Sequence, residues 1–412
     1  MSGLNFLNKL LDGVDVEWLS LGELGDFIRG NGLQKKDFVE SGFPAIHYGQ
    51  IYTRYGLSAD KTFTYVLPEL ANKLRKAQKN DLLLATTSEN DEDVVKPLAW
   101  LGDNVAISGD MMLFRHEQNV KYLAYFFQSE IFQTQKMKYI TGAKVRRVSS
   151  GDLSKIKIPI PCSNNPEKSL AIQSEIVRIL DKFTALTAEL TAELTAELNM
   201  RKKQYNYYRD QLLSFKEGEV EWKTLGEVAQ YSKTRISFEL LDERNYVGVD
   251  NLLQNRAGKS LSNHVPTSGK LTEFIPNDIL IGNIRPYLKK IWQADCIGGT
   301  NGDVLVIRCI DSSINTRYLY QILADDKFFE YNMQHAKGAK MPRGSKEDIM
   351  KYPIPVPPLT LQARIVEILN KFDTLTNSIT EGLPREIELR QKQYEYYRDL
   401  LFSFPKPETA SN

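Results

Sequence analysis

The feature that most constrains this chain is an internal repeat with a single offset of 189 residues. The run IVRILDKFTALT from Ile176 recurs as IVEILNKFDTLT from Ile365. Later in the same segments, RKKQYNYYRDQLLSF recurs as RQKQYEYYRDLLFSF, so that 176–215 and 365–404 align without a gap and are identical at 22 of 40 positions. Unrelated segments would match at only a few positions. The sequence therefore indicates a duplication.

The repeat is cyclic, because the segment that follows the first repeated helix also begins the chain. EVEWKTLGEV from Glu219 matches DVEWLSLGEL from Asp15. Proline-punctuated, strand-like runs precede the two helices, KIPIP at 157–161 and KYPIP at 351–355. A chain that starts after one helix and ends with the other fits a ring-like order, with neighbouring termini and pseudo-two-fold symmetry.

Two variable regions, at about 18–155 and 222–350, lie between the repeated helices. They share landmarks rather than sequence, such as GAKVRR at 142–147 and GAKMPR at 338–343. Short apolar runs broken by Gly, Asn and Asp predict strands and turns. Each variable region is therefore predicted to be a mixed α/β domain.

Within these regions, 120–132 and 316–332 are expected to be helical, and 298–302 is expected to be a turn rather than a cofactor loop. The predicted fold class is α+β, with two mixed α/β domains separated by two long helices. The predicted organisation is 1–155 for the N-terminal segment and first domain, 156–218 for the proline strand and first spacer helix, 219–350 for the second domain, and 351–412 for the second spacer helix and tail.

Both repeated helices carry an amphipathic stripe that suits a partner helix. In the first helix the apolar positions recur every three or four residues, at Ile176, Ile179, Leu180, Phe183, Leu186 or Thr187, Leu190, Leu194 and Leu198. The second helix has counterparts from Ile365 to Ile379. The two helices are therefore expected to pack antiparallel as a coiled-coil-like pair. Gly382 and Pro384 predict a break in the second helix.

The tetrapeptide TAEL occurs three times in succession over 187–198. Its residues are strong helix formers, and each unit adds about 6 Å of helix. If the helix separates two domains that bind DNA, one unit corresponds to one or two base pairs at roughly 3.4 Å each, and the repeats set a spacing. An incidental low-complexity expansion in a solvated helix is the alternative.

Aromatic side chains are concentrated near the end of each repeated helix, in the motif QYxYYRDxLLxF and its second copy. Packing between helices is the usual role of such residues, but Tyr and Arg are also enriched at protein interfaces. The candidates for spacing and partner docking are Leu190, Leu194, Leu198, Tyr205, Tyr208, Arg209, Tyr394, Tyr397 and Arg398.

Composition excludes several classes of protein. No window approaches the ~18 apolar residues of a membrane span, no signal peptide is evident, and a soluble, cytoplasmic protein is expected. Three cysteines fit neither a disulfide framework nor a metal knuckle, and the four histidines have no metal-ligand spacing. The run from Arg256 to Ser260 ends like a phosphate-binding loop, but Leu253 stands where the first glycine belongs. We therefore expect no catalytic or metal residue.

Charge is locally uneven although the net charge is only +1. Between Gln133 and Lys157 seven basic residues stand against one acid, Asp152, and the matching stretch of the second half is also basic. Clustered Lys and Arg on loops are suited to DNA phosphates, and loop-tip side chains can read base edges. A solvated surface is the alternative for any single cluster, but recurrence at matching places favours DNA binding.

The helical and N-terminal segments resemble the specificity subunit of a Type I restriction-modification system, most closely its Type IC branch. The resemblance lies in the TAEL repeats, SLAIQSEIVRILDKF, RKKQYNYYRDQLLSF, LLDGVDVEW and REIELRQKQYEYYRDLLFSFPKPE. It implies that each variable region is a target recognition domain for one half of a bipartite, asymmetric DNA sequence. It also implies that the helices set the gap and dock two modification subunits.

In such a system the partner subunits carry the chemistry. The modification subunits use S-adenosylmethionine to methylate adenine N6, and the restriction subunits use ATP and Mg²⁺ to translocate and cleave DNA. The resemblance implies no cofactor on this chain itself. The implied DNA-contacting residues are Tyr48, Gln50, Arg54, Tyr55, Lys144, Arg146 and Arg147 in the first domain, and Asn251, Arg285, Tyr287, Lys289, Lys340 and Arg343 in the second.

Two other classes of function stay open at this point. One is a structural scaffold whose coiled coil joins partners without DNA. The other is an enzyme with an unrecognised site in a variable domain. Sequence-selective DNA binding separates the first from a specificity subunit, and methylation by the chain alone would reveal the second.

Overall fold

The computed structural model describes residues 9, 11, 13–216, 218–378 and 380–405. The remaining positions of the predicted segments, which include the start of 1–155 and the end of 351–412, lie outside the described residues. The chain divides into two compact units, Met1–Glu189 with Gln391–Asn412 and Leu190–Arg390. The first unit thus contains both ends of the chain.

Three long helices follow from the apolar stripes. Helix α8 (Pro166–Leu212) runs without interruption through the TAEL repeats, and α13 (Leu359–Asn377) and α14 (Gly382–Phe402) form the second spacer. The predicted break is confirmed, because Ser378 after α13 is extended and Gly382 has a φ of 76°. A Cβ at Gly382 would lie 2.5 Å from the Thr374 carbonyl oxygen, so only glycine fits there without a shift.

In the first unit the sheets have the orders β5-β3-β10-β6, β2-β11-β7-β9-β4, β12-β8 and β1-β13. The strands are β1 (Val16–Ser20), β2 (Gly25–Arg29), β3 (Phe43–Ile46), β4 (Ser58–Ala59), β5 (Thr64–Val66), β6 (Lys76–Ala77), β7 (Leu82–Ala85), β8 (Thr87–Ser88), β9 (Lys96–Trp100), β10 (Val105–Ile107), β11 (Met111–His116), β12 (Arg146–Arg147) and β13 (Lys157–Pro161). Most pairs are antiparallel, as expected for short strands joined by tight turns.

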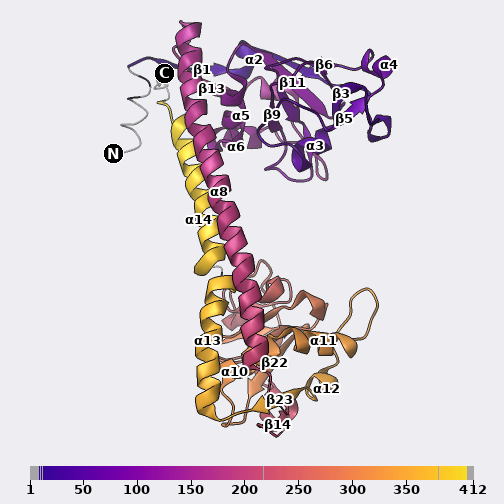
Figure 1. Ribbon diagram of the computed structural model, residues 1–412, viewed down its shortest axis with the longest axis vertical. Helices are drawn as coiled ribbons and strands as arrows, with labels where there is room; N and C mark the ends of the chain where they lie inside the picture. Colours follow the sequence, from indigo (N-terminus) through magenta and orange to yellow (C-terminus); the bar gives the residue numbers. More distant parts are fainter. Residues whose placement is uncertain (1–8, 10, 12, 217, 379, 406–412) are drawn as a thin grey trace. The chain divides into compact units, whose positions relative to one another are not determined.

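The short helices of the first unit cover these sheets (Figure 1). They are α2 (Leu21–Leu24), η1 (Lys35–Asp37), α3 (Tyr48–Thr53), α4 (Pro68–Ala71), α5 (Val120–Gln128), α6 (Glu130–Met137) and α7 (Ser150–Leu153). The predicted helical segment 120–132 is divided at Ser129, whose hydroxyl accepts a 3.3 Å hydrogen bond from the Phe132 N–H and so caps α6.

In the second unit the sheets have the orders β15-β22-β19-β20, β16-β18-β21-β17 and β14-β23. The strands are β14 (Glu221–Thr224), β15 (Ala229–Tyr231), β16 (Arg235–Ser237), β17 (Tyr246–Val247), β18 (Lys270–Phe274), β19 (Ile279–Gly282), β20 (Ile291–Gln293), β21 (Gly298–Thr300), β22 (Val304–Cys309) and β23 (Pro353–Val356). The short helices are α9 (Leu225–Val228), η2 (Phe238–Leu240), η3 (Gln254–Arg256), η4 (Pro286–Leu288), α10 (Thr316–Leu323), α11 (Asp326–Gln334) and α12 (Lys346–Ile349).

Two local predictions differ from the structure here. The segment 316–332 is divided between α10 and α11 by Asp325, whose carboxylate caps α11. The turn predicted at 298–302 is wrong over its first part, because β21 pairs with β17 and β18 there. Glycine is needed in this strand for close approach, since a Cβ at Gly298 would lie 2.0 Å from the Asn245 carbonyl oxygen.

The duplication reappears as matched contacts between each α/β domain and a repeated helix. In the first unit the Gln173 Oε1 atom of α8 accepts a 3.0 Å hydrogen bond from the Asn119 N–H. In the second unit the Gln362 Oε1 atom of α13 accepts a 2.8 Å bond from the Asn315 N–H. Both glutamines are fully buried. Equivalent side chains therefore join equivalent elements, as the pseudo-two-fold repeat predicts.

Aromatic stacks repeat in the same way where α8 meets the second spacer. Phe183 stacks on Tyr397 with ring centroids 5.3 Å apart, and the equivalent pair, Phe372 and Tyr208, stacks at 5.5 Å. Figure 1 shows a stretch of α8 beside α14 in the first unit and beside α13 in the second. The Trp18 indole N–H also donates to the Pro405 carbonyl at 3.0 Å, which joins the described ends of the chain. The antiparallel helix pairing and the cyclic order are confirmed.

His116 at the end of β11 makes the stability of the first unit dependent on pH. Burial lowers the pKa of this imidazole to about 4, and its Nδ1 atom accepts a 3.1 Å hydrogen bond from the Gln118 N–H. The pKa of His116 is therefore lower in the folded chain than in the unfolded chain, where it is about 6.5. Because the unfolded chain takes up the proton first, the stability that burial of the neutral imidazole contributes above pH 6.5 is lost as the pH falls toward 4.

Between pH 7 and pH 4.5, the free energy of unfolding of the wild type should fall by about 2 kcal/mol more than that of the His116→Gln variant. Glutamine keeps an acceptor for the Gln118 N–H and has no proton to gain, so the acid titration of the carboxylates cancels in the comparison. Urea denaturation of both full-length proteins at the two pH values measures the difference. Equal losses would show that burial of His116 does not set this dependence.

Candidate nucleic-acid interface

The two GAK segments form equivalent hairpins, one in each unit. In the first, Thr141 and Arg147 exchange two backbone hydrogen bonds of 2.9 Å, and Lys337 and Arg343 do the same in the second. Each hairpin is also bonded to a second segment, through β12 pairing with β8 in the first unit and through an isolated bridge from Ile284 to Arg343 in the second. Both hairpins are therefore anchored to the rest of their unit.

Glycine is required near the start of each hairpin. Gly142 has a φ of 94° and Gly338 a φ of 102°, the left-handed region that disfavours other residues. A Cβ at Gly142 would lie 2.2 Å from the Val145 carbonyl oxygen, and one at Gly338 would lie 3.3 Å from the Met341 carbonyl oxygen. This explains why the Gly of the GAK sequence recurs at the same place.

The predicted cations of the hairpins are accessible. Lys144, Arg147, Lys340 and Arg343 are exposed, and Arg146 is half-buried. Arg146 pairs with Asp91 at 2.8 Å and Arg343 pairs with Asp303 at 3.2 Å. Ion pairs at such exposed positions contribute little to stability, so a phosphate can replace the carboxylate at small cost.

The first-domain candidates on α3 and directly after it differ in how exposed they are and in how many contacts they make within the protein. Gln50 is occupied within the protein, since its Oε1 atom accepts from the His47 N–H at 2.9 Å and its amide donates to Thr64 at 3.2 Å. Tyr55 is buried against Phe63, Tyr48 is half-buried, and Arg54 is exposed. Arg54, which directly follows α3, therefore offers an exposed charge to a ligand.

In the second domain the structure brings four candidates together. Arg285 donates its backbone N–H to the Pro342 carbonyl at 2.7 Å, so the η4 loop lies against the second hairpin. Arg285 and Tyr287 are exposed on this loop, beside the hairpin that carries Lys340 and Arg343. A cationic loop with an exposed tyrosine next to a cationic hairpin suits contacts with the phosphates and base edges of DNA.

Two other predicted DNA contacts, Asn251 and Lys289, are engaged in contacts within the protein. Asn251 is buried, and its amide bonds the Gly248 N–H at 2.6 Å and the Ser260 carbonyl at 3.0 Å, which holds a loop together. Lys289 pairs with Asp326 at 2.7 Å, and burial lowers the pKa of its ammonium group. Their proposed DNA contacts stay a prediction, and the contacts seen here are internal.

Lys289 belongs to a cationic cluster that the sequence did not reveal. Arg256 contacts Asp326 as well, and burial together with nearby Arg209 lowers the pKa of Arg256 to about 10. Arg209 is almost fully buried, with its guanidinium carbon 4.1 Å from the centre of the Tyr205 ring. Arg256 lies in a sequence that offered only a failed phosphate-loop pattern, so no signal identified it.

The candidates on the spacer helices divide into packed and accessible residues. Tyr205 is buried and donates to the Gln321 side chain at 2.9 Å, whereas Tyr208 is exposed. Tyr394 accepts a 3.1 Å hydrogen bond from Thr184, and Arg398 pairs with the adjacent Asp399. The other members are half-buried, namely Leu190, Leu194, Leu198 and Tyr397. Docking of partners at these residues stays a prediction.

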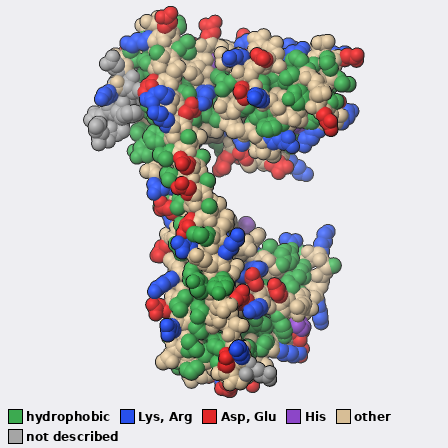
Figure 2. All heavy atoms as spheres, viewed as in Figure 1, with side chains coloured by type: hydrophobic (Ala, Val, Ile, Leu, Met, Phe, Trp, Pro, Cys, Tyr) green, Lys and Arg blue, Asp and Glu red, His purple; other side chains and the backbone are tan. Residues whose placement is uncertain are grey.

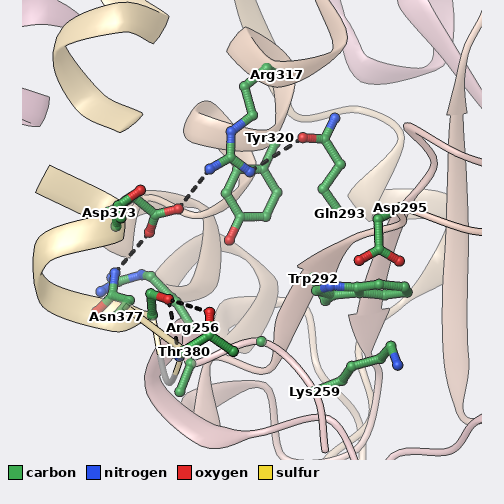
Figure 3. Close-up of a pocket in the computed structure, with 14 residues that line it drawn as sticks. Arg256, Lys259, Trp292, Gln293, Asp295, Arg317, Tyr320, Asp373, Asn377 and Thr380 are labelled. Atoms are coloured by element: carbon green, nitrogen blue, oxygen red, sulfur yellow. Dashed lines mark hydrogen bonds and ion pairs between the residues drawn. The ribbon is translucent and has the colours of Figure 1, made fainter. Parts of the chain in front are cut away.

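A polar pocket of about 370 Å³ lies in the second unit, beside the end of α13 (Figure 3). Arg317 spans it, donating to Asp373 at 2.7 Å and to Gln293 at 3.3 Å. Lys259 lies 5.1 Å from the centre of the Trp292 ring. Charged side chains of the lining thus contact one another or an aromatic ring.

Among the described residues no group of His, Cys, Asp and Glu side chains is placed to hold a metal ion. In the same part of the chain, every helix is too short or too polar to cross a membrane. Figure 2 shows Lys and Arg interspersed with Asp and Glu over the visible faces of both units. The local basic hairpins are thus set in a surface of mixed charge.

The duplicated α+β units with paired spacer helices define the fold of a Type I specificity subunit. A chain from a structure titled for the assembly and conformational transition of the type I R-M system superposes with a TM-score of 0.61 at 16% identity, over 94% of this chain and 97% of that one. The HsdS subunit from Thermoanaerobacter tengcongensis superposes with a TM-score of 0.50 at 15% identity, over 94% and 96%.

The chain belongs to the family described as Type I restriction modification DNA specificity domain, whose model matches residues 13–200 and 217–389. It is 42% identical to the Escherichia coli EcoR124I/EcoR124II specificity subunit over the whole of both chains. It is 34% identical to the Escherichia coli EcoprrI specificity subunit, over 92% of this chain and 93% of that one. Family members are specificity subunits, which lack catalytic activity, and the resemblance predicted from the helical segments is confirmed.

Proposed function

We propose that this specificity subunit binds a bipartite, asymmetric DNA sequence, with each recognition domain reading one half-site. The observation that carries the proposal is the recurrence of one basic hairpin, at 141–147 and 337–343, on two domains whose other surfaces differ. The shared hairpin supplies phosphate contacts, and the differing surfaces supply differing base contacts. Two recognition domains with different base contacts, joined by one spacer, would bind an asymmetric target with two half-sites.

We further propose that the spacer helices set the gap between the half-sites and dock two modification subunits. The exposed Tyr208 and the half-buried Tyr397 and Leu198 are candidates for that surface. The partners, acting with DNA in the cytoplasm, would supply the cofactors: S-adenosylmethionine for adenine methylation, and ATP with Mg²⁺ for restriction subunits. Under this proposal the chain itself would hold none of them.

Mapping of methylated adenines in DNA from cells that carry the complete system tests the proposal. The expected result is methylation at one bipartite sequence with a fixed gap. A filter-binding assay of the complex with its modification subunits should then show selective binding to that sequence. Binding without sequence preference would contradict the proposal and favour a scaffold, and methylation by this chain alone would reveal an enzyme.

Replacement of Arg147 or Arg343 by Ala is expected to weaken DNA binding about tenfold at low salt and to reduce the salt dependence by about one phosphate contact. Both side chains are exposed on the hairpins, so folding should be unaffected. Titrations of the assembled complex at several salt concentrations measure both quantities. Arg178→Ala, which removes an exposed arginine paired with Glu175 on α8, is the matched control. Unchanged affinity at every salt concentration would remove the hairpin arginines from the interface.

A further inference from the structure

We propose that Val145 and Met341, the apolar residues at the tips of the two basic hairpins, enter the DNA base stack beside the adenine to be methylated. This inference rests on the proposed function. Val145 is 44% exposed and Met341 is 47% exposed, although both side chains are apolar. Lys144 and Lys340 precede them directly, so each apolar tip stands next to a cation. An exposed apolar residue among cations suits a ligand that presents phosphates outside and stacked bases inside.

The two residues occupy one structural position. Val145 lies two residues before Arg147, and Met341 lies two residues before Arg343; these arginines close the equivalent backbone pairs of the two hairpins. Because each hairpin is bonded to a second segment, to β8 in the first unit and to Ile284 in the second, its apolar residue is held in place. The hairpin between α11 and α12 projects from its unit in Figure 1. An anchored hairpin with an exposed apolar residue therefore recurs once in each recognition domain.

Recurrence indicates a task that is common to both half-sites. Residues that read different bases must differ between the domains, and the surfaces around α3 and η4 do differ. The hairpin instead keeps its Gly, Ala and Lys, an apolar tip and the final Arg. The feature that both half-sites share under the proposed function is an adenine that a partner subunit methylates. The hairpin is thus assigned to that adenine rather than to sequence discrimination.

The chemistry of methylation explains why an apolar side chain is needed there. The N6 atom of adenine is not reachable by an enzyme active site while the base is stacked in a duplex, so the base must be turned out. The turned-out base leaves a gap beside its partner thymine. An apolar side chain that enters the gap replaces the lost stacking contacts, and neighbouring Lys and Arg side chains hold the flanking phosphates.

The test uses the full complex with modification subunits and two kinds of duplex. An unmodified duplex reports the methylation rate at each half-site, and a duplex in which 2-aminopurine replaces the target adenine of one half-site reports the turning-out of that base by fluorescence. Val145→Ser should reduce the fluorescence increase and the methylation rate at one half-site about tenfold, equivalent to about 1.4 kcal/mol in the activation barrier. The other half-site should be unaffected, and Met341→Ser should show the reverse pattern. The exchanges Val145→Met and Met341→Val should retain both signals, because either side chain performs the same task.

Matched controls are Leu67→Ser and Ile310→Ser, which remove exposed apolar side chains of the same domains away from the hairpins. Unchanged fluorescence and methylation in Val145→Ser and Met341→Ser, with selective binding intact, would overturn this proposal and leave the proposed function standing. Loss of modification-subunit binding in these variants, seen by gel filtration, would instead make the tips a protein contact and also overturn it. A wild-type complex without selective binding would overturn both.

Discussion

Deletion of one TAEL unit, Thr191–Leu194, is expected to shorten the gap between the two half-sites by one or two base pairs and to leave both half-site sequences unchanged. The four residues contribute about 6 Å to α8, against roughly 3.4 Å for each base pair. Methylation at the original spacing should fall by at least about a hundredfold, because the two recognition domains can no longer bind together and their joint affinity is lost.

The helix should tolerate this deletion. Leu190, Leu194 and Leu198 are each half-buried and recur at intervals of four, so removing four residues brings another leucine close to the vacated position. The mismatch is a rotation of about 40°, because an α-helix has 3.6 residues per turn. The packed residues on either side, Phe183 and Tyr205, lie outside the deletion and keep their own partners.

The matched control keeps the length and changes the sequence, with Thr191→Ala and Glu193→Gln in one protein. Sequencing-based detection of methylated adenine in cells measures the half-sites and gap of each variant. The control should methylate the original sequence. A deletion variant that changes a half-site and keeps the gap would contradict the role of the repeats as a spacer.

Helix periodicity explains why so much of the fold could be predicted. The stripe from Ile176 to Leu198 and its copy from Ile365 identified both spacers, because an apolar stripe on a helix must be buried against other elements. Ile176 and Leu180 lie in one hydrophobic cluster with residues of α5 and α14. The ends of the short helices and strands were harder to predict, because local capping and close backbone contacts determine them. Ser129 divides what periodicity alone presents as one helix. Gly298 lies in a strand because a neighbouring carbonyl leaves no room for a side chain.

The candidate interface was predictable where it repeats and not where it depends on local packing. The hairpin cations follow from the GAK segments, which recur in the sequence. Whether Asn251 or Gln50 faces solvent depends on hydrogen bonds to loop residues that a single sequence does not reveal. Val145 and Met341 were not among the predicted contacts, although the recurring GAK segments already place them at one position.

Gln362→Met is expected to destabilise the second unit by about 3 kcal/mol, because it leaves several buried polar groups without partners. The Gln362 amide bonds three groups that cannot move away: the Asn315 N–H at 2.8 Å and the carbonyl oxygens of Ser313 and Pro357, each at 2.8 Å. Methionine fills a similar volume, so the loss measures hydrogen bonds rather than a cavity. These bonds join α13 to the start of α10 and hence the spacer to its recognition domain.

Gln173→Met makes the equivalent change in the first unit and should cost less, about 1–2 kcal/mol. Apart from the Asn119 N–H, its partners are the side chains of Gln118 and Ser169, which can turn to other partners or to water. Gln211→Met, an exposed position on α8, is the control and should change the stability by less than about 0.5 kcal/mol.

Hydrogen exchange of the full-length chain, followed peptide by peptide, assigns each loss to a unit. Gln362→Met should accelerate exchange in α10 and leave α5 protected, and Gln173→Met should do the opposite. Gln362→Met should also weaken binding of DNA at the half-site of the second domain and leave binding at the other half-site unchanged. Equal losses of protection in both units after either substitution would show instead that the two units unfold together. The two copies of the repeat would then not be independent units of stability.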